Sequence, residues 1–221
     1  MPNWCANSLK IKPKTKAAKT FMERKLLPEL EKGKDSQIFN LISPMPQELI
    51  NTVCGSVGED KRDAHKAQME ANVEKFGYPT WYEYAHANWG TKWDASVYDY
   101  HTDVDGQLYI SFDTAWGPPI VFYDKLGEMG YEVEAFYREE GMAFAGKYSD
   151  GCDDYYEYGS MSADEIRDQL PEELDDMFSI SQYQRDVEQE NRRDEWDEMC
   201  GELEKTEWYL LLVWRRNETR R

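Results

Sequence analysis

The stretch from residue 93 to residue 148 constrains the fold of this chain more than any other. Its pattern predicts two strands joined by a tight turn, then a helix, then two further strands. Asp105-Gly106 is typical of a hairpin turn, and Gly117-Pro118-Pro119 is typical of a helix start that Gly130 would end. The predicted elements are the strands Trp93–His101 and Gln107–Asp113, a helix with its apolar stripe at Phe122, Leu126 and Met129, and the strands Tyr131–Arg138 and Ala143–Tyr148.

The first thirty residues add one strand and one helix to this order. Cys5–Lys12 alternates as a strand does, and Pro13 ends it. Thr15 is a cap for a helix whose last turn is made uncertain by Pro28. The order becomes βαββαβ with one added hairpin strand. It predicts an α+β fold in which an antiparallel sheet carries two helices on one face.

A helical insertion is predicted near residues 46–88, inside a domain that spans residues 1–150. Ile38–Ile42 before it reads as a short strand or turn. Glu59–Phe76 is a polar helix with few apolar positions, and Thr80 caps a short aromatic helix that ends at Ala87.

Residues 151–221 are predicted to form an acidic, mainly helical C-terminal extension, after an acidic loop over Ser149–Gly159. Ser162 and Glu165 have the spacing of a capping box, and a long helix begins near Ser181. Periodicity leaves Glu207–Trp214 open between helix and strand. The apolar stripe over Trp196–Trp214 suits docking on its own domain or on a second copy, as in a homodimer.

The charge is −18, from 44 acidic and 26 basic side chains. Such a field opposes direct binding to duplex DNA, RNA or anionic lipid and attracts basic partners, although solubility alone is another explanation. The four cysteines have neither CxxC spacing nor a nearby histidine, which argues against a zinc site and fits a reducing cytosol. No leader and no membrane span is expected, so the predicted location is cytoplasmic.

Two tryptophan segments, "NWGTKWDA" and "FDTAWGPP", flank the predicted hairpin. One interpretation is that their indoles cover an edge of the sheet as core, because buried aromatic rings dominate core energetics. The other is an aromatic pocket with a few polar groups at its rim. The residues of this candidate pocket are Trp89, Lys92, Trp93, Asp94, Asp113 and Trp116, with Thr114 beside them.

Four segments also resemble a known family. "MPNWCANSLKI", "WGTKWDA", "FDTAWGPP" and "YREEGMAFAGKY" are similar to the YubB-type ferredoxin-like proteins of phages, prophages and conjugative plasmids. The resemblance covers roughly residues 1–12 and 80–150. It implies a ferredoxin-like domain and a bacterial host cytoplasm, and it carries over no catalytic residues.

No catalytic signature appears, so no enzyme activity, cofactor or metal is predicted. The adjacent acidic pairs do not have the alternating ligands of a calcium loop. His65, His86 and His101 lie on different predicted elements, and no glycine-rich phosphate loop is present.

Three functions remain open. The first is an acidic interaction protein that inhibits a basic host partner, such as a nucleic-acid-binding or defence protein, because carboxylates imitate phosphate spacing. Its predicted surface comprises Asp150, Asp153, Asp154, Glu157, Glu172, Glu173, Asp175 and Asp176. The second is a module that binds single-stranded nucleic acid or a small ligand, either through aromatics of the sheet face, Tyr98, Tyr100 and Tyr109, or through the two tryptophan segments. The third is an enzyme with an unrecognised acidic metal site.

Overall fold

The structure is a computed structural model that describes the backbone of residues 3–218 and the side chains of residues 3–202. It contains two compact units, residues 1–159 and residues 160–221. The sequence predicted the division after residue 150. The structure divides the chain after Gly159, because Cys152–Glu157, predicted as part of a loop, is the last strand of the sheet.

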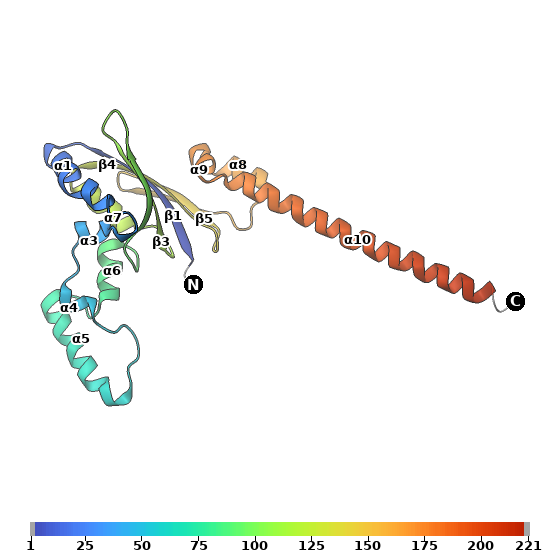
Figure 1. The fold of residues 1–221 in the computed structure, drawn as a ribbon, viewed down its shortest axis with the longest axis horizontal. Coiled ribbons are helices and arrows are strands. Elements are labelled where there is room, and N and C mark those ends of the chain that lie inside the picture. The colour runs from blue at the N-terminus through green and yellow to red at the C-terminus, as the bar shows by residue number, and fades with distance from the viewer. Residues whose placement is uncertain (1–2, 219–221) are drawn as a thin grey trace. The chain divides into compact units, whose positions relative to one another are not determined.

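The first unit is built on a six-stranded antiparallel sheet with the order β2-β3-β1-β4-β5-β6 (Figure 1). Strand β1 lies between β3 and β4, so Leu9 stands opposite Ile110 on one side and Ala135 on the other. The predicted α+β class with an antiparallel sheet is therefore confirmed. The strands are β1 (Trp4–Pro13), β2 (Ser96–Thr102), β3 (Leu108–Ala115), β4 (Tyr131–Glu139), β5 (Phe144–Ser149) and β6 (Cys152–Glu157).

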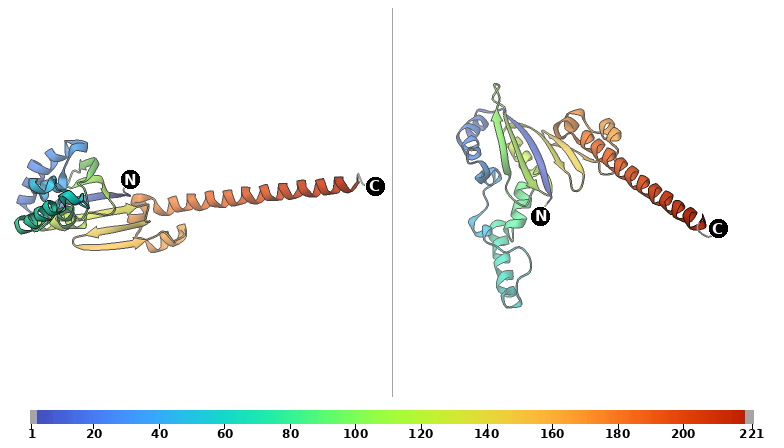
Figure 2. Two further views of the ribbon diagram at one scale, coloured as in Figure 1. Left: turned by 90° about the horizontal axis from the view of Figure 1, so that it is seen from below. Right: turned by 45° about the vertical axis from the view of Figure 1, so that its right-hand side comes forward.

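The main core lies between one face of this sheet and the helices α1 (Lys16–Phe21) and α7 (Ile120–Glu128). Every second side chain of β1 and β3 points to that face, as the pleat of a strand requires. Figure 2 shows α1, in blue, on one side of the sheet. The buried core includes Leu9, Ile11, Ala18, Met22, Phe39, Leu108, Ile110, Phe112, Phe122, Leu126, Val133 and Ala135.

The first helix continues through Pro28 by changing its winding. After α1 the chain makes a π-helical segment, η1 (Met22–Leu26), and then α2 (Leu27–Leu30). A proline ring clashes with the carbonyl four residues before it, which for Pro28 is that of Arg24. The wider π-turn accommodates the ring, and the Leu27 N–H bonds to the Met22 carbonyl instead.

Ile38–Ile42 is a helix, α3, and not the predicted strand or turn. It follows the short 3₁₀ turn η2 (Gly33–Asp35). The carboxylate of Asp94 accepts the backbone N–H groups of Phe39 and Asn40 at 2.9 Å each. The local sequence carries no sign of this cap, because the cap comes from a distant segment.

The insertion is helical, as predicted. It contains α4 (Gln47–Ile50), η3 (Glu59–Lys61), α5 (Arg62–Phe76) and α6 (Trp81–Trp89). Thr80 caps α6 by accepting the Tyr82 N–H, which confirms the predicted start, while the helix continues two residues beyond the predicted end. Gly90, with φ of 82°, ends it in the left-handed conformation that favours glycine.

The second unit is helical and comprises α8 (Ala163–Gln169), α9 (Glu172–Phe178) and α10 (Ile180–Glu218). The capping box of Ser162 and Glu165 is present. Residues 207–214 belong to α10, so the strand alternative for this segment is wrong. The predicted apolar stripe begins at Trp196, which is exposed, and from Leu203 onward its side chains lie outside the described residues. No helix in the part of the chain described here has the length and apolar composition needed to cross a bilayer.

Candidate binding site

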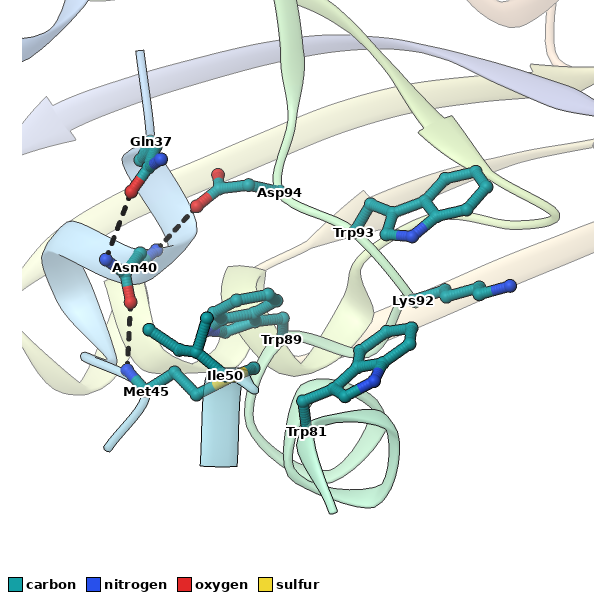
Figure 3. A pocket seen from close by; sticks show the side chains of 9 residues that line it. All are labelled: Gln37, Asn40, Met45, Ile50, Trp81, Trp89, Lys92, Trp93 and Asp94. Atoms are coloured by element: carbon teal, nitrogen blue, oxygen red, sulfur yellow. Dashed lines mark hydrogen bonds between the residues drawn. The ribbon is translucent and has the colours of Figure 1, made fainter. Parts of the chain in front are cut away.

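The tryptophan groove is a shallow hollow of about 230 Å³ at one end of the first unit. Three indoles, two aliphatic side chains, two amides, one ammonium and one carboxylate surround it (Figure 3). Its lining comprises Gln37, Asn40, Met45, Ile50, Trp81, Trp89, Lys92, Trp93 and Asp94. Mostly apolar walls with a few polar groups are the usual composition of a binding site.

Helix α6 and the loop after it supply the aromatic wall. Trp81 stands at the first position of α6 and Trp89 at the last. Trp89 is only 7% exposed, contacts the Phe39 ring, and donates its indole N–H to the Ser43 carbonyl at 2.9 Å. This indole therefore forms a fixed floor that needs no partner. Gly90 reverses the chain and brings Trp93 over the same hollow.

Lys92 places the only ammonium among the groove-lining side chains beside two indoles. Its Nζ lies 4.6 Å from the centre of the Trp93 ring and 5.9 Å from that of Trp81. Both distances are within the range of a cation–π interaction. The charge is thereby held at the rim of the groove, where it can meet an anionic group on an incoming molecule.

Asp94 acts inside the protein. Besides the two amides of α3, its carboxylate accepts the N–H of Ala95 at 2.9 Å. Burial raises the pKa of this carboxyl to about 6, even though the hydrogen bonds from the backbone of Phe39, Asn40 and Ala95 act in the opposite direction. Its position and bonding make Asp94 the link between α3 and the tryptophan loop.

Further exposed indoles lie next to the groove. Trp93 is 39% exposed, and its ring centre is 6.2 Å from that of Trp4, which is 46% exposed. Trp116, 50% exposed, donates its backbone N–H to the carbonyl of Asn3, the neighbour of Trp4. Its φ of 74° is unusual for a bulky residue. We call the three exposed indoles Trp4, Trp93 and Trp116 the indole rim. The rings of Trp4 and Trp93 are in contact, and Trp116 is placed near them by its backbone bond to Asn3.

The predicted pocket is thus assembled in part. Trp89, Lys92, Trp93 and Asp94 line one hollow, whereas Asp113 and Trp116 do not line it. Asp113 lies on β3 opposite Ala6, with its pKa raised by burial. The expectation that all three tryptophans are core is wrong for Trp93 and Trp116. Sequence reasoning missed Gln37, Asn40, Met45, Ile50 and Trp81.

Most of these missed residues come from segments that the sequence shows only as an insertion or a turn. Among the five missed residues, only Trp81 could have been connected to the groove from the sequence. The Thr80 cap places it at the start of the helix that ends with Trp89.

The predicted acidic surface divides between the two units. Asp150, Asp153, Asp154 and Glu157 belong to the first unit and the remaining four to α9 in the second. Asp150 accepts the Val133 N–H at 3.0 Å, and this bond, assisted by Lys14, lowers its pKa. Asp153 accepts the Tyr137 hydroxyl at 2.8 Å.

In the second unit Asp175 accepts both the backbone N–H and the hydroxyl of Ser181, and so holds the start of α10. Glu172, Glu173 and Asp176 lie on the same short helix. At least four of the eight predicted carboxylates are therefore engaged in internal hydrogen bonds, since Glu157 also accepts the Tyr155 hydroxyl, in addition to the bonds of Asp150, Asp153 and Asp175. The structure gathers the eight into no single site within either unit.

The sheet-face aromatics behave differently from one another. Tyr98 is exposed, and Tyr109 stacks on His101 with ring centres 4.7 Å apart. Tyr100 packs against the core instead, so the prediction of three tyrosines on an open face is wrong for this residue. Among the described side chains, no three histidines, cysteines or carboxylates come together in an arrangement that could hold a metal ion.

Comparison with known proteins gives one distant match, to a solved structure. No family model matches the chain, and no curated protein matches it. Among solved structures, the crystal structure of protein api92 from Yersinia pseudotuberculosis, of family DUF1281, shares 14% identity and a TM-score of 0.34. The match covers 72% of this chain and 99% of that protein.

Proposed function

We propose that the first unit is a protein-interaction module that receives an apolar side chain of a partner polypeptide in the tryptophan groove. The observation that carries this proposal is the set of indoles left in solvent around a preformed apolar hollow. Contiguous exposed apolar surface marks an interaction site more often than a defect of packing. Tryptophan is also the residue type most enriched among the side chains that dominate binding energy.

The size of the groove favours a side chain over a free small molecule. Pockets for small ligands measure roughly 300–1,000 Å³ and bury most of the ligand. The tryptophan groove holds about 230 Å³ and is open on one side, which suits one large aliphatic or aromatic side chain. The indole rim extends the contact surface beyond the hollow, as a macromolecular partner requires.

The charge of the chain favours a protein over a nucleic acid. Aromatic platforms also stack the bases of single strands, but they do so inside basic grooves. Here the net charge is −18, and Lys92 is the one cation in the groove lining. A partner with one carboxylate beside its apolar anchor would satisfy Lys92 without bringing a row of phosphates to an acidic protein.

A second, weaker candidate is the acidic surface. Residues 150–176 carry eleven carboxylates against one arginine, and Asp154 and Glu157 stand exposed on the edge strand β6. A basic partner, such as a host nucleic-acid-binding protein inhibited by a phage- or plasmid-encoded chain, would meet these groups. The internal bonds of Asp150, Asp153 and Asp175 leave fewer free carboxylates than the sequence indicated.

We further infer that the first unit is a ferredoxin-like domain of the YubB type. The order β2-β3-β1-β4, with α7 between β3 and β4, supports this assignment, and β5-β6 would be an added hairpin.

A random dodecapeptide library displayed on phage tests the groove. We expect the full chain to select peptides with a leucine, phenylalanine or tryptophan next to an acidic residue. Affinity for a selected, fluorescently labelled peptide should fall at least tenfold in Trp93→Ala, because a central indole of an interface typically contributes about 2 kcal/mol or more. Trp196→Ala, which removes an exposed indole of the second unit, is the matched control and should bind as the parent does.

The proposal fails if selected peptides bind Trp93→Ala and the parent equally. Saturable quenching of tryptophan fluorescence by a short oligothymidylate, lost in Trp93→Ala, would favour the nucleic-acid alternative.

A further inference from the structure

A second surface of the first unit carries the opposite charge to the protein as a whole. Lys16, Arg24 and Lys25 are exposed on α1 and η1, and in the described part of the chain none of them forms an ion pair. The neighbouring carboxylate of Glu23 lies near Lys19 on another row of the helix. The exposed face is therefore cationic in a chain whose net charge is −18.

These cations border an apolar hollow. Its volume is about 590 Å³, and its lining comprises Lys16, Ala17, Thr20, Phe21, Arg24 and Lys25. Ala17 and Thr20 are small, and Phe21 is half-buried with part of its ring packed against the core. The floor is thus fixed and apolar, and the positive charges stand at its borders. We call this surface the cationic groove.

The spacing of the groove is that of a helix-packing site. Lys16, Thr20 and Arg24 follow one i, i+4 row, while Ala17, Phe21 and Lys25 follow the next. The depression between two such rows is where a second helix inserts its own ridge of side chains. Neither row contains an acidic residue. The π-turn that begins at Met22 and accommodates the Pro28 ring widens the helix within this segment.

We propose that the cationic groove docks an acidic amphipathic helix of a partner protein. The partner would place an apolar ridge over Ala17, Thr20 and Phe21 and carboxylates opposite Lys16, Arg24 and Lys25. Charge complementarity identifies this occupant, since three cations that form no ion pair among the described side chains border a surface with an exposed apolar floor.

Phosphate-rich occupants fit this surface less well. A nucleic-acid backbone has no apolar ridge for the floor. An anionic membrane would also meet the negative field of the chain as a whole, in which carboxylates outnumber cations by 18. Charges separated by more than one Debye length, roughly 8 Å at physiological salt, are largely screened from each other. A single docked helix would therefore respond mainly to the nearby positive charge of the cationic groove, and little to the negative charge elsewhere on the chain.

The test is a titration of the full chain with a labelled 16-residue amphipathic peptide made of leucine, alanine and glutamate. We expect saturable binding that weakens as salt is raised, and at least tenfold weaker binding by the same peptide with glutamine in place of glutamate. Arg24→Glu combined with Lys25→Glu should reduce affinity at least tenfold. Lys61→Glu combined with Arg62→Glu reverses two adjacent exposed cations where η3 meets α5 and should leave binding unchanged.

Ala17→Gln tests the floor without changing charge, because Ala17 is exposed and tolerates a longer side chain on the free helix. This substitution should also reduce the affinity for the peptide. Equal binding by the parent and by the Arg24, Lys25 variant overturns the proposal, and so does absence of binding. Binding of a 20-base-pair duplex or of phosphatidylserine vesicles in place of the peptide, or a dimer lost in that variant, would assign the groove to another occupant and likewise overturn it.

Discussion

Replacing Asp94 by asparagine should change how the stability of this protein depends on pH. In the folded protein burial raises the pKa of Asp94 to about 6, from an ordinary value of 3.8. Between these two values the folded protein holds a proton that the unfolded chain has lost. Asp94 therefore stabilises the fold most below pH 3.8, and this contribution is lost as pH rises through 6.

The magnitude follows from the two pKa values. The free energy of unfolding due to this group should fall by about 2 kcal/mol between pH 4.5 and pH 7. Asparagine keeps one carbonyl oxygen for the α3 amides and does not titrate. The parent should therefore lose about 2 kcal/mol relative to Asp94→Asn across this interval, whatever the other carboxylates contribute to both proteins.

Urea unfolding of both full-length proteins, followed by near-ultraviolet circular dichroism at pH 4.5 and pH 7, measures this difference. Asp150→Asn is an instructive control because the Val133 N–H lowers the pKa of Asp150. Protonation of Asp150 therefore changes the free energy of unfolding only near and below pH 3.8. The difference in this free energy between the parent and Asp150→Asn should not decline between pH 4.5 and pH 7. The reasoning is refuted if the free energy of unfolding of the parent, minus that of Asp94→Asn, stays constant or rises between pH 4.5 and pH 7. Such a result would show that the three backbone N–H bonds outweigh burial.

Three further substitutions and one labelling experiment test the packing. Gly146→Ala should destabilise the protein by about 3 kcal/mol in urea unfolding, because a Cβ there would collide with the Tyr137 ring and lie 2.6 Å from the Asp154 carbonyl. Gly127→Ala in α7 meets nothing within 4 Å and should instead stabilise by up to about 1 kcal/mol. Phe112→Ala should cost about 3–5 kcal/mol, since its ring is fully buried against Phe39. A thiol reagent should modify exposed Cys54 and Cys152 in the native protein and reach buried Cys5, whose pKa burial raises, only after unfolding; rapid native labelling of Cys5 would contradict the placement of β1.

The parts of the fold that local signals determine were predictable. The Asp105-Gly106 turn, the Thr80 cap and the Ser162 capping box each depend on residues within a few positions, and each is present. The sheet followed from them, because the lengths and turns of successive strands limit the pairings available.

Elements that depend on distant partners were not predictable. The helix over Ile38–Ile42 is capped by Asp94, more than fifty residues away, and its own five residues read equally well as a strand. Strand β6 is polar enough to read as a loop, and it forms because β5 offers it a full set of backbone partners from Phe144 to Ser149. Tertiary pairing overrode local composition in both cases.

The site shows the same division. Tryptophans in a short segment drew attention to Trp89 and Trp93, but the opposite wall of the groove comes from Met45 and Ile50, in a region with no pattern of its own. The eight carboxylates show the reverse error. Their density in sequence indicated one surface, whereas internal hydrogen bonds use at least four of them.

The chain offers neighbouring residues that separate binding from folding. Trp93 is partly exposed and donates no hydrogen bond from its indole in the described structure, so its removal should affect a partner and leave the fold intact. Asp94, the next residue, is buried and holds α3, so its removal should affect the fold first. If Trp93→Ala lowers both the free energy of unfolding and the affinity for a partner, the indole supports the fold. The indole rim would then no longer be supported as a binding surface. If Trp93→Ala lowers affinity alone, the exposed position of this indole is explained by a partner.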